Sequence, residues 1–149
     1  MSDPEADPPP LDPARDAAIR ESFAAQSMMA TLGARLVRLG PGAAVIEAPV
    51  AEGARQQHGY AHAALPFAIG DSAAGYAALT LMPEGAEVLT AEIKINLLAP
   101  ARGPLLTATG RVVRAGRRLS VVSAEVWDAE TQVALLQGTM VAVAPRGQG

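Results

Sequence analysis

The chain has 149 residues, close to the length of one average domain. Half of its residues are hydrophobic and 18% are charged, so it has enough apolar material for a packed core. A net charge of −3 and an aromatic content of 3% argue against nucleic acid as a partner, because basic and stacking side chains are both scarce. The sequence contains no cysteine, which excludes disulfides, cysteine nucleophiles and cysteine-based zinc sites.

The first ten residues are acidic and rich in proline, the opposite of a signal peptide. No apolar run reaches the roughly 20 residues that a membrane-spanning helix requires. We therefore expect a cytoplasmic protein without a membrane partner. We expect residues 1–10 to form a disordered tail, residues 11–144 to form a single domain, and residues 145–149 to form a flexible end.

The first half of the domain predicts one helix followed by a hairpin. The helix runs from Asp12 to about residues 30–33, because apolar residues recur there at helical spacing. Two short strands, at 34–39 and 43–50, flank a Gly-Pro-Gly turn. Residues 51–61 are polar and contain glycine without any period, which indicates a loop.

The second half predicts a buried helix and four strands. Residues 63–81 are apolar on nearly every face and have Asp71 as their only charged residue, so this helix must be surrounded by protein. Alternation of apolar and polar residues predicts a strand at 89–97 with Thr90 on the face toward water. Three more strands are expected, at 105–114, 118–127 and 132–143.

This order of elements predicts an α+β fold. An antiparallel sheet of about six strands wraps around one long buried helix, with a further helix at the N-terminus. We assign a set of apolar strand residues to the outer face of the sheet: Val122, Ala124, Val126, Leu136 and Met140. An apolar outer face would be covered by another copy of the chain, which predicts a homo-oligomer.

Asp71 is the residue that most clearly suggests chemistry. An ionised carboxylate in an apolar helix is costly unless it is hydrogen-bonded or faces a wet cleft, so Asp71 is a candidate site residue. The alternative is that Gly70, Asp71 and Ser72 begin the helix and that Asp71 caps it. The sequence leaves both interpretations open.

His62 is a second candidate, at the start of the same helix. It precedes Asp71 by nine positions, or about 13.5 Å of helix, so the two side chains of one chain cannot form a hydrogen-bonded pair. They can serve one site only where subunits pair; the alternative is a loop histidine satisfied by the backbone. Free N–H groups from about Ala63 to Leu65 would point at a cleft, where they could bind a carbonyl oxygen or an oxyanion.

Four arginines surround Gly116 in a predicted turn: Arg111, Arg114, Arg117 and Arg118. A run of charge usually marks a solvated hairpin. Guanidinium groups also suit phosphate oxygens, so a phosphate site is the second interpretation. Two histidines and no cysteine give no basis for a catalytic metal site, and we expect none.

The segment QQHGYAHAALPFAIGDSAAGYAA, residues 56–78, resembles the signature of hotdog-fold acyl-CoA thioesterases, in particular the phenylacetate-degradation branch. Gln56, Gly59 and His62 fall on the family's loop motif Asn-x-x-Gly-x-x-His-Gly-Gly. Asp71 falls on the carboxylate of the following helix, with the family's spacing from the histidine. The similarity continues over Thr90 and the later strands, so that it covers residues 33–143.

The chain departs from the family pattern at two points. Ala63 and Ala64 stand where the family has two glycines, so the amide donors remain but carry methyl groups nearby. A position that needs positive φ would be strained by this change. Gln56 replaces an asparagine and is one methylene longer.

The resemblance implies a thioesterase that hydrolyses an acyl-CoA, with an aryl or a short to medium acyl group, to free acid and CoA. It implies that Asp71 acts as general base or nucleophile while the N–H of Ala64, from the opposing subunit, polarises the carbonyl. Gln56 would orient water or the thioester, His62 would shape the loop, and Thr90 would position the nucleophile or water.

For the rest of the substrate, the resemblance implies a CoA site near Gly59 and Ala63, with the phosphates at Arg114, Gly116 and Arg117. It implies a dimer of dimers, and no cofactor other than the CoA that the substrate carries. A non-catalytic acyl-CoA-binding module is the alternative function, since the two alanines alter the loop. A hotdog dehydratase is a weaker option, because its site needs a histidine and a carboxylate that face each other across a dimer, and the spacing here fits the thioesterase pattern better.

Overall fold

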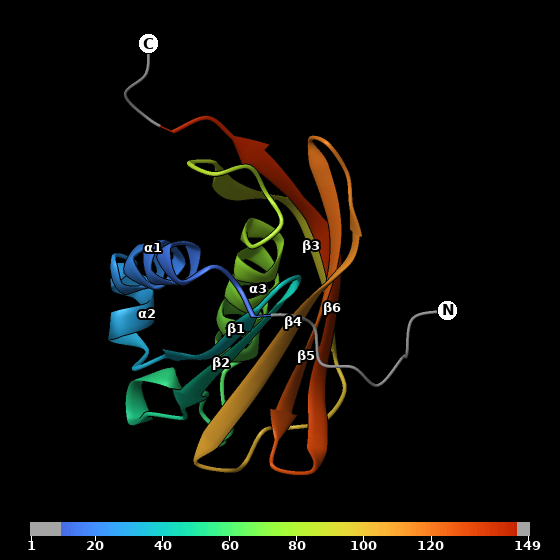
Figure 1. Cartoon of the computed structure of the whole chain (residues 1–149). Helices are drawn as coiled ribbons and strands as arrows, with labels where there is room; N and C mark the ends of the chain where they lie inside the picture. The colour runs from blue at the N-terminus through green and yellow to red at the C-terminus, as the bar shows by residue number, and fades with distance from the viewer. Residues whose placement is uncertain (1–9, 146–149) are drawn as a thin grey trace.

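The computed structural model describes residues 10–145, and the predicted tails lie almost entirely outside this range. Figure 1 shows one long helix, α3 (Ala64–Leu79), held by a curved antiparallel sheet. The strands are β1 (Arg35–Gly40), β2 (Ala43–Pro49), β3 (Glu87–Leu97), β4 (Leu105–Ala115), β5 (Leu119–Asp128) and β6 (Thr131–Val143). The predicted α+β fold of six strands around one buried helix is confirmed, and each strand lies within two residues of its predicted bounds at either end.

The sheet has the order β1-β2-β4-β5-β6-β3. β3 follows α3 in the chain but pairs with β6, so the crossover places it at one edge of the sheet while β1 forms the other. The short turns between β4, β5 and β6 explain why these strands are antiparallel neighbours. The segment between β2 and α3 contains the 3-10 turn η1 (Glu52–Ala54) in the predicted loop.

α3 lies unusually close to the sheet because small residues line the contact. Ala73, Ala74 and Ala77 of the helix are fully buried, and α3 contacts every strand from β2 to β6. Gly110 of β4 faces the backbone of Ala73, where any Cβ would overlap the helix carbonyl group. The alanine-rich composition of the helix therefore serves packing: its backbone rests on the strand with no side chain in between.

The side chains that we assigned to the outer face of the sheet lie on its inner face. Val122, Ala124, Val126, Leu136 and Met140 are each at most 1% exposed and belong to the core around α3. The prediction was wrong because alternation separates two faces of a strand without telling which one carries the helix. Their neighbours on β5 and β6, including Glu125 and Gln137, are the ones that face outward.

The predicted N-terminal helix is two helices, α1 (Pro13–Ala24) and α2 (Ser27–Thr31). Asp12 caps α1 by accepting a hydrogen bond from the Arg15 amide. Gln26 leaves the helical conformation with ψ of 103°, and its side chain donates to the Tyr76 hydroxyl at 2.7 Å. The break between the two helices thus coincides with a contact between residues 50 positions apart. The local spacing of apolar residues could not predict it.

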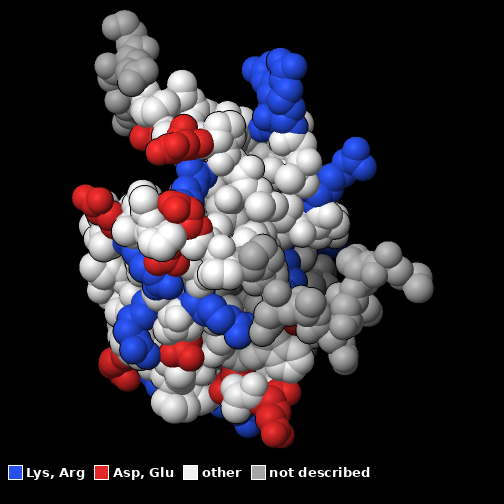
Figure 2. All heavy atoms as spheres, viewed as in Figure 1, with Lys and Arg blue, Asp and Glu red and all other residues white. Residues whose placement is uncertain are grey.

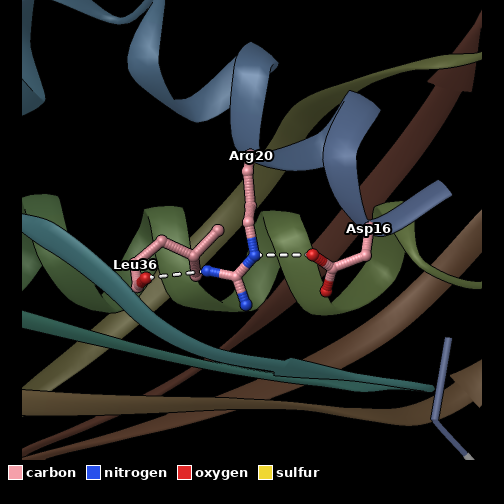
Figure 3. A network of polar contacts seen from close by, with 3 residues as sticks. All are labelled: Asp16, Arg20 and Leu36. Carbon is pink, nitrogen blue, oxygen red and sulfur yellow. Dashed lines mark hydrogen bonds and ion pairs between the residues drawn. The ribbon is translucent and has the colours of Figure 1, made fainter. Parts of the chain in front are cut away.

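α1 is fixed to both β1 and α3. Arg20 forms an ion pair with Asp16 at 2.6 Å and donates to the Leu36 carbonyl at 3.1 Å, as Figure 3 shows. Phe23 packs edge-on against Tyr76 with 5.7 Å between ring centroids. Arg15 donates to the last carbonyl of α3, Leu79, at 2.6 Å. A cation at the C-terminus of a helix is favourable, so α1 holds the far end of α3.

Within the described range, no helix combines the length and the apolar character that crossing a membrane would need.

Candidate active site

Asp71 lies two turns inside α3, so the alternative that it caps the helix is wrong. Its carboxylate is half-buried and accepts a hydrogen bond from Thr90 Oγ1 at 2.7 Å on Oδ1. Burial raises the pKa of Asp71 above its ordinary value, and the hydrogen bond from Thr90 opposes this shift in part. The arrangement is a carboxylate that titrates closer to neutral pH than usual and is held by one neutral donor.

Thr90 reaches Asp71 because β3 contains a bulge. Thr90 pairs with Met140 and Glu92 pairs with Thr139, so that Ala91 has no partner of its own. The extra residue turns Thr90 to the helix side of the sheet, although strict alternation placed it on the face toward water. The prediction for this end of the strand was therefore wrong, and Leu89, expected inside, is 59% exposed.

A cavity of about 450 Å³ opens beside Asp71. Its lining runs along α3 from Asp71 to Leu79, a length of about 12 Å, between α1 on one side and β3 on the other. Ile19, Val88 and other apolar side chains form much of the wall. No local pattern predicts that the N-terminal helix borders this cavity, since α1 and α3 are far apart in the chain.

His62 and the amides after it make local contacts. The Ala64 N–H donates to His62 Nδ1 at 2.9 Å, and the Leu65 N–H donates to the His62 carbonyl at 2.9 Å. The interpretation of His62 as a loop histidine satisfied by the backbone therefore describes this structure. The Ala63 N–H has no acceptor among residues 10–145, so it is the free donor at this helix end.

Replacement of the two glycines causes no backbone strain. Ala63 has φ of −53° and ψ of −26°, which is ordinary right-handed backbone, and Ala64 is the first residue of α3. The only residue other than glycine with positive φ in the described range is Ala129, in the turn before β6. The amides at 63 and 64 are thus in normal helical geometry, with added methyl groups as the remaining change.

Gln56 and Gly59 belong to the loop before α3. The side-chain oxygen of Gln56 accepts a hydrogen bond from the His58 amide, so the side chain folds back on its own loop. Gly59 has φ of 87°, which a residue with a side chain rarely adopts, and its carbonyl accepts from Arg55 Nη1 at 2.7 Å. The loop holds its own shape through these local bonds.

A second cavity of about 630 Å³ lies at this loop and is lined by Gln56, His62 and Ala63 together with Leu97 and Leu98. Asp71 and Thr90 line the other cavity. One chain therefore brings together Asp71 with Thr90, and Gln56 with His62 and Ala63, but it does not bring these two groups to one place. This agrees with the helical distance that separates His62 from Asp71.

The turn between β4 and β5 is tight and basic. The Gly116 N–H donates to the Leu119 carbonyl at 2.9 Å, and a Cβ at position 116 would overlap that carbonyl. The four arginines of the hairpin, Arg111, Arg114, Arg117 and Arg118, are all exposed. Figure 2 shows basic side chains projecting at the upper right, where Figure 1 has this hairpin.

No cluster of three or more histidine, cysteine, aspartate or glutamate side chains suited to a metal ion occurs in the part of the chain that the structure describes.

Comparison with known proteins extends these observations. The family model described as thioesterase superfamily matches residues 58–135. A solved thioesterase family protein of Silicibacter pomeroyi is 41% identical and has a TM-score of 0.84, over 87% of this chain and 98% of that chain. The 1,4-dihydroxy-2-naphthoyl-CoA hydrolase of Listeria monocytogenes is 26% identical over 76% of this chain and 92% of its own length.

The Escherichia coli PaaI protein, from the phenylacetic acid degradation operon, has a TM-score of 0.80 over 88% of this chain and 94% of its own. At 22% identity it shows a shared fold, and the resemblance to this branch that the loop and helix motifs indicated is confirmed at that level. The family model covers more than half of the residues, including the end of the loop, α3 and β3. The chain therefore belongs to the thioesterase superfamily and has its hotdog fold.

Proposed function

We propose that this protein hydrolyses an acyl-CoA thioester to the free acid and CoA. The observation that carries the proposal is Asp71, a half-buried carboxylate of raised pKa that Thr90 holds at the wall of a cavity with polar and apolar lining. Structural carboxylates in an apolar helix would be expected to pair with a cation, whereas Asp71 has a hydroxyl as its hydrogen-bond partner. A carboxylate so placed is available for reaction.

Two routes use the same ionised Asp71. As general base, Asp71 removes a proton from water while the water oxygen bonds to the thioester carbon. The C–S bond then breaks, and the CoA thiolate leaves and takes up the proton from Asp71. As nucleophile, Asp71 bonds to that carbon and expels CoA, and water then hydrolyses the resulting anhydride. In either route Thr90 orients Oδ1 and favours the charged form of the carboxylate.

The amides at the start of α3 are proposed to polarise the thioester carbonyl. Ala63 offers a free N–H, whereas the Ala64 N–H becomes available only when the His62 ring turns away. Gln56 would release the His58 amide to orient water or the thioester, and His62 would shape the loop. Developing negative charge on the carbonyl oxygen would then meet backbone donors at the positive end of a helix.

We further propose that each site is shared between subunits. The carboxylate and the helix amides line different cavities of one chain, so a second chain must supply the missing half. β3 is an edge strand, and Leu89 and Leu97 on it are 59% and 55% exposed, which leaves apolar surface for a partner. Two chains joined here form a dimer, and two dimers form the proposed tetramer.

CoA is proposed to bind with its phosphates at Arg114 and Arg117 around Gly116. The rest of the CoA molecule would pass Gly59 and Ala63. The exposed guanidinium groups of the hairpin make no ion pair among the described residues and are free for phosphate. The acyl group, aryl or short to medium in length, would occupy the cavity beside Asp71. The reaction needs no cofactor other than the CoA that the substrate brings.

Release of CoA from a panel of aryl, short-chain and long-chain acyl-CoA esters tests the proposal. We expect Asp71→Asn, which keeps the shape and removes the base, to lower kcat by roughly 10²- to 10⁴-fold. Asp12→Asn is the matched control, because asparagine caps a helix about as well as aspartate and should leave turnover unchanged. Full turnover in Asp71→Asn would exclude the assigned role.

The contact between His62 and the Ala64 amide favours one other function, a module that binds acyl-CoA without hydrolysing it. In that case the folded wild-type protein would bind acyl-CoA esters tightly and leave them intact after long incubation. Rapid release of CoA excludes this alternative.

A further inference from the structure

Met140 lies next to the contact between Thr90 and Asp71. Its sulfur is 3.4 Å from Thr90 Oγ1, and Asp71 Oδ1 is 2.7 Å from the same oxygen. Met140 is fully buried, whereas Thr90 is exposed and Asp71 is half-buried. The Thr90 hydroxyl therefore lies between a carboxylate at the cavity and a sulfur that belongs to the core.

The backbone fixes the position of this sulfur. Met140 pairs with Thr90 of β3 on one side and with Ser120 of β5 on the other, so β6 is held there by both neighbouring strands. The Met140 methyl group lies 4.0 Å from the place that a Cβ of Gly75 would occupy, one helical turn after Asp71. The thioether is thus packed between the sheet and the turn of α3 that carries the carboxylate.

Thr90 has one hydroxyl hydrogen and two acceptors within reach. A hydroxyl donates once and accepts through its lone pairs, whereas a thioether sulfur only accepts. While Asp71 is ionised, its carboxylate is the stronger acceptor and takes the hydrogen bond. A proton on Oδ1 can be donated to Thr90 Oγ1 only if the threonine hydrogen turns elsewhere. Among residues 10–145, the sulfur of Met140 is the other acceptor that this hydroxyl can reach.

We propose that Met140 is a positioning residue for the reaction, because its sulfur accepts the Thr90 hydroxyl when Asp71 has taken the proton from water. In the general-base route, water gives its proton to Asp71, which then donates a hydrogen bond to Oγ1 while the Thr90 hydrogen turns from Oδ1 to Sδ. The proton itself stays on Asp71 until the CoA thiolate takes it. This inference rests on the proposed function, because that function protonates Asp71.

Other titratable groups line the same cavity, but in the described range none of them bonds to Asp71. α1 contributes Arg15, whose guanidinium already donates to three backbone carbonyls. α3 contributes Tyr76 and β3 contributes Glu87. β6 contains no titratable side chain. Thr90 is thus the side chain through which the carboxylate is coupled to the core.

Met140→Leu tests the role of the sulfur, since leucine nearly keeps the volume and should preserve the fold. Loss of the acceptor disfavours the protonated carboxyl, so the acidic limb of the kcat/KM profile should move to lower pH by about half a pH unit. Thr90→Val should move the limb the opposite way, because it removes the donor to the carboxylate. In the Thr90→Val background, Met140→Leu should leave the limb where it is. A packing defect would act in both backgrounds alike.

Norleucine gives a second, closer replacement, because it keeps the shape of methionine and removes only the sulfur. Protein from a methionine auxotroph would carry norleucine at all five methionines. We expect the same shift as in Met140→Leu, and no further shift when Met140→Leu itself is labelled. Met29→Leu is the matched control, since Met29 is 2% exposed, lies on α2 and does not line this cavity. It should leave both the limb and kcat unchanged.

Carbon-13 NMR of the Asp71 carboxyl group reads the same titration without turnover, and Asp71→Asn identifies its signal. We expect the titration midpoint to fall in Met140→Leu by the same amount as the acidic limb, and only where Thr90 is present. An unchanged midpoint in Met140→Leu, or an equal shift in both Thr90 backgrounds, would overturn the proposal. A protein that hydrolyses no acyl-CoA yet shows the expected midpoints would break the proposed function alone.

Discussion

The two halves of the proposed site are built in different ways. Asp71 and Thr90 stand on a buried helix and a strand, and a bulge in β3 aims one at the other across 19 residues of chain. The other half consists of an exposed loop, with Gln56 and His62, and of Ala64, the first residue of α3. The side-chain hydrogen bonds there join residues only two positions apart. The contacts of the first half lie within one chain, whereas the donors of the second half bond to their own loop and, in the proposed function, meet the carboxylate of another subunit.

In the proposed function, only the loop half depends on the pairing of two chains. Packing within one chain fixes the carboxylate half, because α3 and β3 belong to the same core. The loop half has the donors but no substrate geometry of its own, because its cavity lacks the carboxylate.

Mixing two inactive variants should restore activity. Asp71→Asn removes the carboxylate, and Ala63→Pro removes the free amide at a position whose φ of −53° suits proline. In randomly mixed dimers one intact site forms in each mixed pair, so about a quarter of the wild-type rate should return. Co-refolding followed by the CoA-release assay measures it, with Ala63→Ser as the control that keeps the amide. Mixed dimers without activity would show that each chain works alone.

Thr90→Val tests the carboxylate half. Valine removes the hydrogen bond that lowers the pKa of Asp71, so the pKa should rise further and the acidic limb of the kcat/KM profile should move to higher pH. We expect about a tenfold loss at neutral pH that shrinks as the pH is raised. Thr109→Val on β4 is the matched control. An unshifted acidic limb would mean that Thr90 does not act through Asp71.

Arg114→Gln and Arg117→Gln test whether the basic hairpin belongs to the site. We expect KM for acyl-CoA to rise about three- to tenfold in each variant while kcat stays unchanged, because only attraction to phosphate is lost. The effect should be largest at low salt. Arg38→Gln, at an exposed arginine of β1, is the control. If KM responds equally in all three variants, the hairpin is a solvated turn and nothing more.

Asp71→Asn should also raise the thermal stability slightly at pH 7 to 8. The pKa of Asp71 is higher in the folded than in the unfolded chain, so the folded state binds the proton more tightly. Stability therefore falls as the pH rises from the pKa of the unfolded chain to that of the folded chain. Asparagine carries no charge and avoids this penalty. The difference in Tm should vanish below about pH 3, where the wild-type carboxyl is protonated in both the folded and the unfolded chain. A difference that grows in acid would reverse the assigned direction.

Sequence pattern predicted the elements of this fold but not the contacts between them. Period-two alternation located the strands, and the apolar run located α3, because both signals lie within one element. Alternation could not reveal the bulge at Ala91, since one extra residue exchanges the two faces without changing composition. It also could not show that Val122 and Met140 face the helix.

In the candidate site, too, features within one element could be predicted and contacts between distant elements could not. Asp71 stood out as a lone charge in an apolar segment, which is a local signal. The bond from Ala64 to His62 is local too, and the backbone alternative for His62 anticipated it. Gln26 and Tyr76 went unnoticed because they meet across 50 residues. A single tyrosine in an alanine-rich helix was the one sign available.

Gly110 has a consequence for the evolution of this enzyme. It touches no proposed ligand, yet the absence of a side chain there sets how deeply α3 sits in the sheet. A larger residue would lift the helix, and the 2.7 Å contact between Asp71 on the helix and Thr90 on the sheet would open with it. We therefore expect related proteins to vary the residues that line the cavity. We expect them to keep glycine at position 110, so that the carboxylate stays within hydrogen-bonding distance of its donor.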